Sequence, residues 1–148
     1  MDVRIVKTGA DEEQRVEIHC REVTQQVREI ADFVRSRQGL LTGMLDGRQY
    51  GISVVSVYYA EAVDERVFLY SAGKVYETKH RLYELEERLK EKGFLRVSKS
   101  MLLNLMKVKA IKPMLNGRFL ALLDNGEEVV ISRKYVPQLK NTLKGGDS

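Results

Sequence analysis

The sequence predicts a mainly β fold of the α+β class, and three observations support this. Asp-Gly or Asn-Gly pairs stand at 46–47, 116–117 and 125–126, and they favour tight hairpins because type I′ turns need positive φ twice. Short runs rich in Val, Tyr and Leu recur between turn residues from Leu40 onward. Leucines 82, 85 and 89 have helical spacing and precede Gly93, which is typical of one inserted helix. These patterns indicate small packed antiparallel sheets or a partial barrel.

Residues 1–39 are predicted to form a β-β-α extension. Val3–Val6 and Arg15–His19 have the composition or alternation of strands. The helix expected over Glu22–Gln38 has a stripe of Val23, Val27, Ile30 and Val34, and Gly39 ends it. Forty residues bury little core alone. The stripe therefore either packs on the rest of the chain or forms a dimer interface, and the sequence leaves both interpretations open.

The remaining elements follow from alternation and turn residues. Strands are expected over 40–45, 48–52, 54–62, 66–71, 74–79, 107–112, 118–123 and 128–132. Over Lys107–Lys112, lysines alternate with apolar residues, which predicts one buried face and one lysine-lined face. A terminal helix is expected over 133–143. Pro137 either opens this helix or follows a distorted lead-in turn, because proline is tolerated only in a first turn.

Composition narrows the class of protein. The chain has 148 residues, 43% of them apolar, and one cysteine, Cys20. A single cysteine excludes an internal disulfide and argues against a thiolate zinc site. No apolar run reaches the roughly 18 residues of a membrane span, and the first residues lack the layout of a secretion signal. We therefore expect a globular protein of the reducing cytoplasm.

Positive charge is concentrated in the second half of the chain. Residues 1–45 hold seven basic and eight acidic residues, whereas residues 90–140 hold eleven basic and four acidic residues, a net charge of +7. A basic half joined to a neutral piece indicates a polyanion-binding module with an appendage.

Catalytic constellations are missing from the sequence. The two histidines, His19 and His80, are far apart, and acidic pairs such as Glu86-Glu87 are adjacent, so their side chains do not face each other. The sequence has no phosphate-binding glycine loop and no nucleophile elbow. We expect no enzyme, no small-molecule substrate, no cofactor and no metal site.

One short segment combines cations with hydroxyl groups. Arg96-Val97-Ser98-Lys99-Ser100 carries two cations and two hydroxyl groups around one apolar residue, just after the predicted helix. Such a loop can donate to phosphates and base edges together. The alternative is an ordinary polar turn with a capping serine.

The motif extended to Asn104 resembles the Arg-x-His/Ser-Arg/Lys-Ser-x-x-x-Asn signature of the LytTR DNA-binding domain family. Four further segments resemble that family's pattern in the same order: Tyr59–Ala62, Arg81–Glu86, Asn116–Arg118 and Ser132–Val136. The resemblance covers about residues 40–143. It implies an elongated module of small stacked antiparallel sheets with an inserted and a C-terminal helix, here preceded by the β-β-α extension.

The resemblance also implies a bacterial transcriptional regulator that reads the major grooves of double-stranded DNA with loops. The positions that would contact bases are Arg66, Lys99 and Lys134. Contacts to the DNA backbone are expected from Ser98, Ser100, Lys107, Lys109, Lys112, Arg118, Arg133 and Tyr135. Ser98 replaces the histidine of many members, and Lys99 and Lys134 are point donors where arginine would be a bidentate fork, which can change the preferred base.

The expected organisation is an extension at 1–39 and a DNA-binding domain at 40–148, without the receiver domain that many members carry. The expected partners are DNA with direct repeats, a second copy in a homodimer, and a regulatory membrane protein. The sequence also allows a different class of function, a protein-interaction module. Its basic face would bind an acidic or membrane-protein partner, and its nucleic-acid affinity would be incidental. RNA is disfavoured because the aromatic residues lie among apolar strand neighbours.

Overall fold

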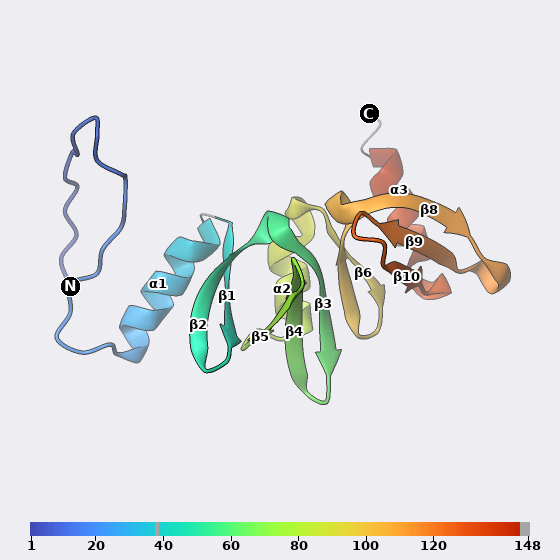
Figure 1. Cartoon of the computed structure of the whole chain (residues 1–148), viewed down its shortest axis with the longest axis horizontal. Coiled ribbons are helices and arrows are strands. Elements are labelled where there is room, and N and C mark those ends of the chain that lie inside the picture. Colours follow the sequence, from blue (N-terminus) through green and yellow to red (C-terminus); the bar gives the residue numbers. More distant parts are fainter. Residues whose placement is uncertain (38, 146–148) are drawn as a thin grey trace.

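The computed structural model describes residues 1–37 and 39–145. Within these ranges the chain forms three α-helices and ten strands, together with short 3₁₀ turns (Figure 1). In chain order they are α1 Gln25–Arg37, β1 Leu40–Leu45, β2 Arg48–Ser53, β3 Val57–Val63, β4 Arg66–Ser71, β5 Lys74–Thr78, α2 Leu82–Leu89, β6 Phe94–Ser98, β7 Met101–Asn104, β8 Val108–Pro113, β9 Phe119–Leu123, β10 Glu128–Ile131 and α3 Val136–Gly145. No helix in the described ranges is long and apolar enough to cross a membrane.

The strands form two antiparallel sheets. The first has seven strands in the order β2-β1-β5-β4-β3-β7-β6, and the second has three in the order β10-β9-β8. The sheets follow one another along the long axis of the molecule, with α1 beyond one end of the larger sheet (Figure 1). The prediction of a mainly β, elongated module of stacked antiparallel sheets is confirmed.

Tight turns connect the first hairpins. Asp46 and Gly47, between β1 and β2, have φ values of 52° and 77°, as the Asp-Gly pair predicts for a type I′ turn. Asp64 and Glu65, between β3 and β4, also have positive φ, at 50° and 66°. Positive φ at two successive non-glycine residues is uncommon, so this second turn has no strong signal in the sequence.

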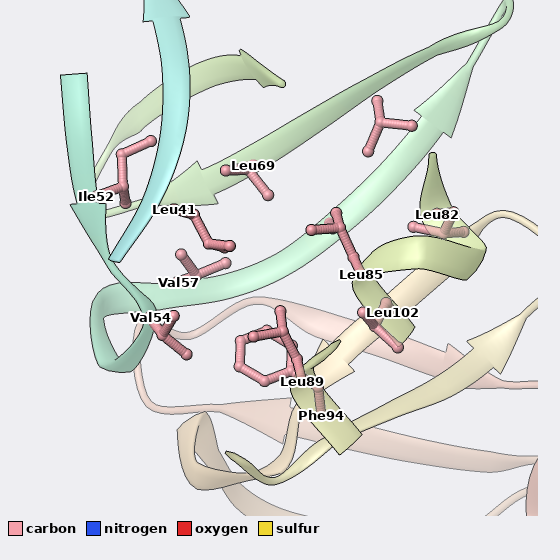
Figure 2. Close-up of a cluster of buried hydrophobic side chains, with 12 residues drawn as sticks. Leu41, Ile52, Val54, Val57, Leu69, Leu82, Leu85, Leu89, Phe94 and Leu102 are labelled. Atoms are coloured by element: carbon pink, nitrogen blue, oxygen red, sulfur yellow. The ribbon is translucent and has the colours of Figure 1, made fainter. Parts of the chain in front are cut away.

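The larger core lies between α2 and the seven-stranded sheet (Figure 2). Leu82, Leu85 and Leu89 of α2 are all buried, as their spacing predicts. They meet residues such as Leu69 and Leu102 of the sheet, which are fully buried. Burying a leucine side chain contributes about 1.5–3 kcal/mol, so this cluster fixes α2 on the sheet.

A second core joins the two sheets. It holds Val97 and Leu103 from β6 and β7, together with residues of β9, β10 and α3 such as Leu123, Ile131 and Leu139. Leu102 belongs to the first core and Leu103 to the second, because successive side chains of a strand point to opposite faces. The β6–β7 hairpin is therefore covered on both faces and held between the two cores.

The two strands predicted in the extension do not form. Residues 1–24 contain a turn but no strand, and Val3 and Ile5 are 86% and 97% exposed. A two-stranded ribbon is marginal in water without a third strand or a packing surface, and the described residues supply neither. The strand part of the β-β-α prediction is therefore wrong for the single chain.

The helix of the extension does form, as α1. Thr24 Oγ1 accepts a hydrogen bond from Val27 N at 3.3 Å at its start, and Gln38, the expected last helical residue, lies outside the described residues. Val27 is 8% exposed, and Thr42 Oγ1 of β1 donates to Asp32 Oδ1 at 3.2 Å. Helix α1 thus packs on β1 of its own chain, which is the first of the two interpretations.

One detail of the second sheet differs from expectation, whereas the start of α3 agrees with the sequence. A register shift between Val108 and Ala110 interrupts the β8–β9 ladder, so Ala110 is exposed while Val108 and Ile111 are half-buried. The alternation predicted for Lys107–Lys112 is broken by this bulge, which reorients the side chains that follow it. Pro137 is the second residue of α3, after a 3₁₀ turn over Arg133–Tyr135, so the lead-in turn and the helix are both present.

Candidate nucleic-acid interface

Two of the three predicted base-contacting residues lie at adjacent hairpin tips. Arg66 follows the β3–β4 turn, and Lys99 lies in the β6–β7 turn. Strands β3 and β7 pair with Glu61 opposite Met101, and Ala62 N donates to Ser100 O at 2.8 Å. The two turns therefore lie side by side at one end of the seven-stranded sheet (Figure 1).

The backbone of the Lys99–Ser100 turn is fixed by bonds within the hairpin. Arg96 Nη1 donates to Lys99 O at 2.8 Å, and Ser100 N donates to Ser98 Oγ at 3.3 Å. Arg96 also contacts Glu86 of α2, with Nη2 and Oε1 3.2 Å apart. Ser98 and Arg96 thus hold the turn, while the side chain of Lys99 is exposed.

The third predicted base-contacting residue, Lys134, is brought to the same region by the second sheet. Ser132 N donates to Val97 O at 2.8 Å, so the terminal motif is bonded to the strand that leads into the Lys99 turn. A bulge between Arg96 and Ser98 removes Val97 from the register with β7. The carbonyl of Val97 can therefore accept the hydrogen bond from Ser132 N. Lys134 is exposed, with Nζ 5.7 Å from the centre of the Tyr135 ring.

The Asn116-Gly117 turn packs against the terminal motif. Gly117 has a φ of 74°, and a Cβ at this position would lie 2.9 Å from Arg133 Cδ. A larger residue at position 117 would therefore require the Arg133 side chain to move, and the positive φ itself favours glycine. Three of the five segments that resemble the family signature, around residues 96–104, 116–118 and 132–136, are thus neighbours in space.

The predicted contact residue Arg66 has an acidic environment. Its guanidinium lies 3.7 Å from Glu77 of β5, and the adjacent turn consists of Asp64 and Glu65. Both partners of the ion pair are largely exposed, so the pair contributes little to stability. The pairing does lower the positive charge that Arg66 offers, and a reading of local sequence does not show Glu77 nearby.

The remaining predicted phosphate-contacting residues fall into two groups. Ser100, Lys109, Lys112 and Arg133 are exposed. Ser98, Lys107, Arg118 and Tyr135 are only half-exposed, and each has a partner in the fold. Ser98 Oγ accepts from Ser100 N, and the Tyr135 ring lies near Lys134 Nζ. Lys107 Nζ lies 4.9 Å from the centre of the Tyr58 ring, and Arg118 Nε donates to Leu115 O at 3.4 Å.

Two tyrosines of β3 connect the sheets beside this region. Tyr58 donates to Asp124 Oδ1, and this hydrogen bond raises the pKa of the Tyr58 phenol above its ordinary value. Burial, followed by a hydrogen bond to Glu127, raises the pKa of Tyr59. Both phenols therefore stay protonated at neutral pH, and Tyr58 donates to a carboxylate of the β9–β10 hairpin.

Asn104, the last residue of the central motif, has a structural position. It is 1% exposed, and its Nδ2 donates to Val57 O at 2.8 Å. Its Oδ1 accepts from Met106 N at 3.0 Å. The side chain therefore ties the end of β7 to the start of β3 and cannot reach a ligand at the surface.

Known proteins with similar sequences and structures identify the family of this chain. The family model for the LytTr DNA-binding domain matches residues 47–144. The chain belongs to the LytTR DNA-binding domain family. A solved LytTr DNA-binding domain from Bacillus cereus shares 28% identity and a TM-score of 0.67, covering 71% of this chain and 96% of that one. The α-helices described here are each separated by strands, so this LytTR chain has no helix-turn-helix within residues 1–37 and 39–145.

Relatives differ in what surrounds the LytTR domain. The sensory transduction protein LytT of Bacillus anthracis is 28% identical over 93 residues, 63% of this chain and 38% of that protein. The chain thus matches less than half the length of such relatives. A Staphylococcus aureus protein named "Uncharacterized HTH-type transcriptional regulator" is 25% identical over 145 residues, 97% of this chain and 98% of that protein. The extension before the LytTR domain therefore falls within a segment aligned with that relative.

Proposed function

We propose that this LytTR protein is a sequence-specific transcriptional regulator that reads double-stranded DNA with loop residues. The observation that carries the proposal is the Ser132–Val97 backbone bond, which joins two turns whose lysines, Lys99 and Lys134, are exposed. Turns held by a rigid scaffold can present such donors to guanine O6 and N7 in a major groove. Arg66, on the adjacent tip, is the third base contact of this proposal.

The phosphate contacts in this proposal come from side chains that have no described partner inside the fold. Lys109, Lys112 and Arg133 are exposed cations, and Ser100 is an exposed hydroxyl. Contacts to phosphates position a protein on the duplex without reading sequence. Ser98, Lys107, Arg118 and Tyr135 take a smaller part, because they are half-buried.

The test is a fluorescence-anisotropy titration of the whole chain. One duplex comes from the DNA upstream of its own gene, a second has random sequence, and both are measured at two salt concentrations. We expect the upstream duplex to bind at least about a hundredfold tighter, a threshold set below the roughly thousandfold preference at the low end of specific recognition. The log–log salt slope should be about −0.9 per neutralised phosphate.

Equal and weak binding of both duplexes that disappears with added salt would contradict the proposal. The basic surface would then serve the alternative class, with an acidic or membrane-protein partner. A panel of duplexes that tiles the neighbouring promoters separates this result from a wrong choice of operator, because a specific regulator should select one member of the panel.

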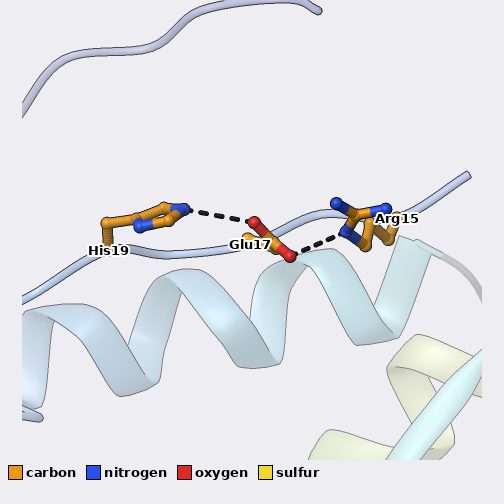
Figure 3. A network of polar contacts seen from close by, with 3 residues as sticks. All are labelled: Arg15, Glu17 and His19. Carbon is orange, nitrogen blue, oxygen red and sulfur yellow. Dashed lines mark hydrogen bonds and ion pairs between the residues drawn. The ribbon is translucent and has the colours of Figure 1, made fainter. Parts of the chain in front are cut away.

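We further propose that residues 1–39 form an extension that contacts a second copy, and that residues 40–148 form the DNA-binding domain. β1 belongs to the domain because it pairs with both β2 and β5. Within the extension, Glu17 lies between Arg15 and His19, at 2.7 and 3.1 Å (Figure 3), and the Arg15 contact lowers the pKa of its carboxyl. In the sequence these residues alternate with Val16 and Ile18, which would share the opposite face if the segment paired as a strand.

In this proposal a second copy supplies the partner strand or packing surface that residues 1–24 lack in the single chain, and a homodimer suits an operator of two repeats. We expect light scattering after gel filtration to give a dimer for the whole chain and a monomer for Ile5→Asp, whose side chain is 97% exposed in the single chain. Asp11→Asn, a change in the exposed turn of the same segment, is the control. A monomeric whole chain, or a dimer unaffected by Ile5→Asp, would contradict this role and leave the extension for a membrane-protein partner.

A further inference from the structure

Arg96 connects helix α2 with the turn that carries Lys99. Its side chain is 14% exposed on β6. One terminal nitrogen donates to Lys99 O at 2.8 Å, and the other lies 3.2 Å from Glu86 Oε1. The Arg96 Nε is buried and has no partner among the described residues. The guanidinium is therefore enclosed by protein, and the Arg96 side chain itself is poorly placed to bind a ligand.

The turn needs this connection because the strand ladder stops before it. The last paired residues of the hairpin are Ser98 and Met101, and the bulge at Val97 precedes them. The carbonyl of Lys99 lies outside the ladder, so the hydrogen bond from Arg96 sets its direction. The orientation of that peptide unit in turn sets where the Lys99 side chain leaves the backbone.

The other end of the connection is rigid. Glu86 lies on α2 between Leu85 and Leu89, which are both buried in the larger core. A planar guanidinium can bond a carboxylate with one nitrogen and a carbonyl with another, whereas a lysine ammonium is a single point charge on a flexible chain. Glu86 also neutralises Arg96, so the positive charge presented at the tip is that of Lys99.

We propose that Arg96, held by Glu86, is a positioning residue that fixes the β6–β7 turn in the shape that reads a base through Lys99. The inference rests on the proposed DNA-binding function and deepens it. It assigns Arg96 and Glu86 to discrimination between sequences, whereas general affinity depends on the number of cations facing phosphates. Neither residue was among the contact residues predicted from the sequence.

The selected duplex is the member of the promoter panel that the unmodified chain binds most tightly. The experiment measures the ratio of the affinity for this duplex to the affinity for the random duplex. Arg96→Lys keeps the positive charge but loses the planar group that contacts both Lys99 O and Glu86. We expect this variant to lower the ratio of affinities roughly tenfold, because one good base contact contributes about 1–3 kcal/mol to discrimination. The affinity for the random duplex should change by less than about twofold. Glu86→Ala should lower the ratio in the same direction. Glu87→Ala is the matched control, because Glu87 is the next residue on α2 and pairs with the exposed Lys90 at 2.8 Å.

A double-mutant cycle separates positioning from general stability. In a Lys99→Ala background, Glu86→Ala should have no further effect on the ratio, because the side chain that it positions is gone. Thermal unfolding shows that each variant is folded at the assay temperature. If Lys99→Ala lowers the ratio but Arg96→Lys and Glu86→Ala do not, the positioning role is wrong while the DNA-binding function stands. If no duplex is discriminated even by the unmodified chain, the function itself fails.

Discussion

Asn104→Ala is expected to lower the free energy of unfolding by about 2–5 kcal/mol, because one buried and one part-buried backbone group lose their partner and an unsatisfied buried group costs about 1–3 kcal/mol. The groups are the carbonyl of Val57 and the amide of Met106, which lie 2.8 and 3.0 Å from the Asn104 side chain. Urea denaturation followed by circular dichroism measures this loss. The substitution should lower the urea concentration at the unfolding midpoint, with little change in the dependence of the unfolding free energy on urea concentration.

The matched control is Asn125→Ala. Asn125 Oδ1 also accepts a backbone hydrogen bond, from Glu127 N at 3.0 Å, but this bond is exposed and water can replace it. We expect a loss of no more than about 1 kcal/mol there. Equal losses at the two asparagines would show that burial of Asn104 does not matter, and would contradict a structural role for the last residue of the motif.

The β1–β2 hairpin and helix α2 were predictable because their signals are local, whereas the β6–β7 hairpin was not among the expected strands. Asp46-Gly47 forms the expected turn, and the leucine stripe of α2 is buried as its spacing requires. The strands of the extension were not predictable in the same way. Alternation at Arg15–His19 shows only that a strand is compatible with the residues, whereas its formation depends on a partner strand.

The candidate site was predictable to the level of residue type. Lys99 and Lys134 are exposed on turns, as expected from the motifs. The acidic partners of the cations could not be predicted, because they come from distant segments. Glu77 faces Arg66 from β5, and Glu86 faces Arg96 from α2. The bulges at Val97 and Val108 also escape prediction, because a bulge depends on how two strands pair.

Lys99→Ala and Lys134→Ala are each expected to reduce discrimination between the selected and the random duplex by about 1–3 kcal/mol, and the double variant by roughly the sum. The two lysines lie on different turns of the scaffold and share no described contact. Effects at separate sites usually add. Anisotropy titrations with both duplexes measure each loss, and base substitutions in the selected duplex show which position each lysine reads.

Lys109→Ala is the matched control, because it removes the same side chain from an exposed position on β8. Loss of a phosphate contact should weaken binding to both duplexes equally and reduce the magnitude of the log–log salt slope by about 1. Arg66→Ala should reduce discrimination less than Lys99→Ala, since Glu77 and the Asp64-Glu65 turn already offset its charge. If Lys99→Ala instead behaves like Lys109→Ala, Lys99 contacts only the backbone. The specificity would then have to come from Lys134, from Arg66 or from the shape of the DNA.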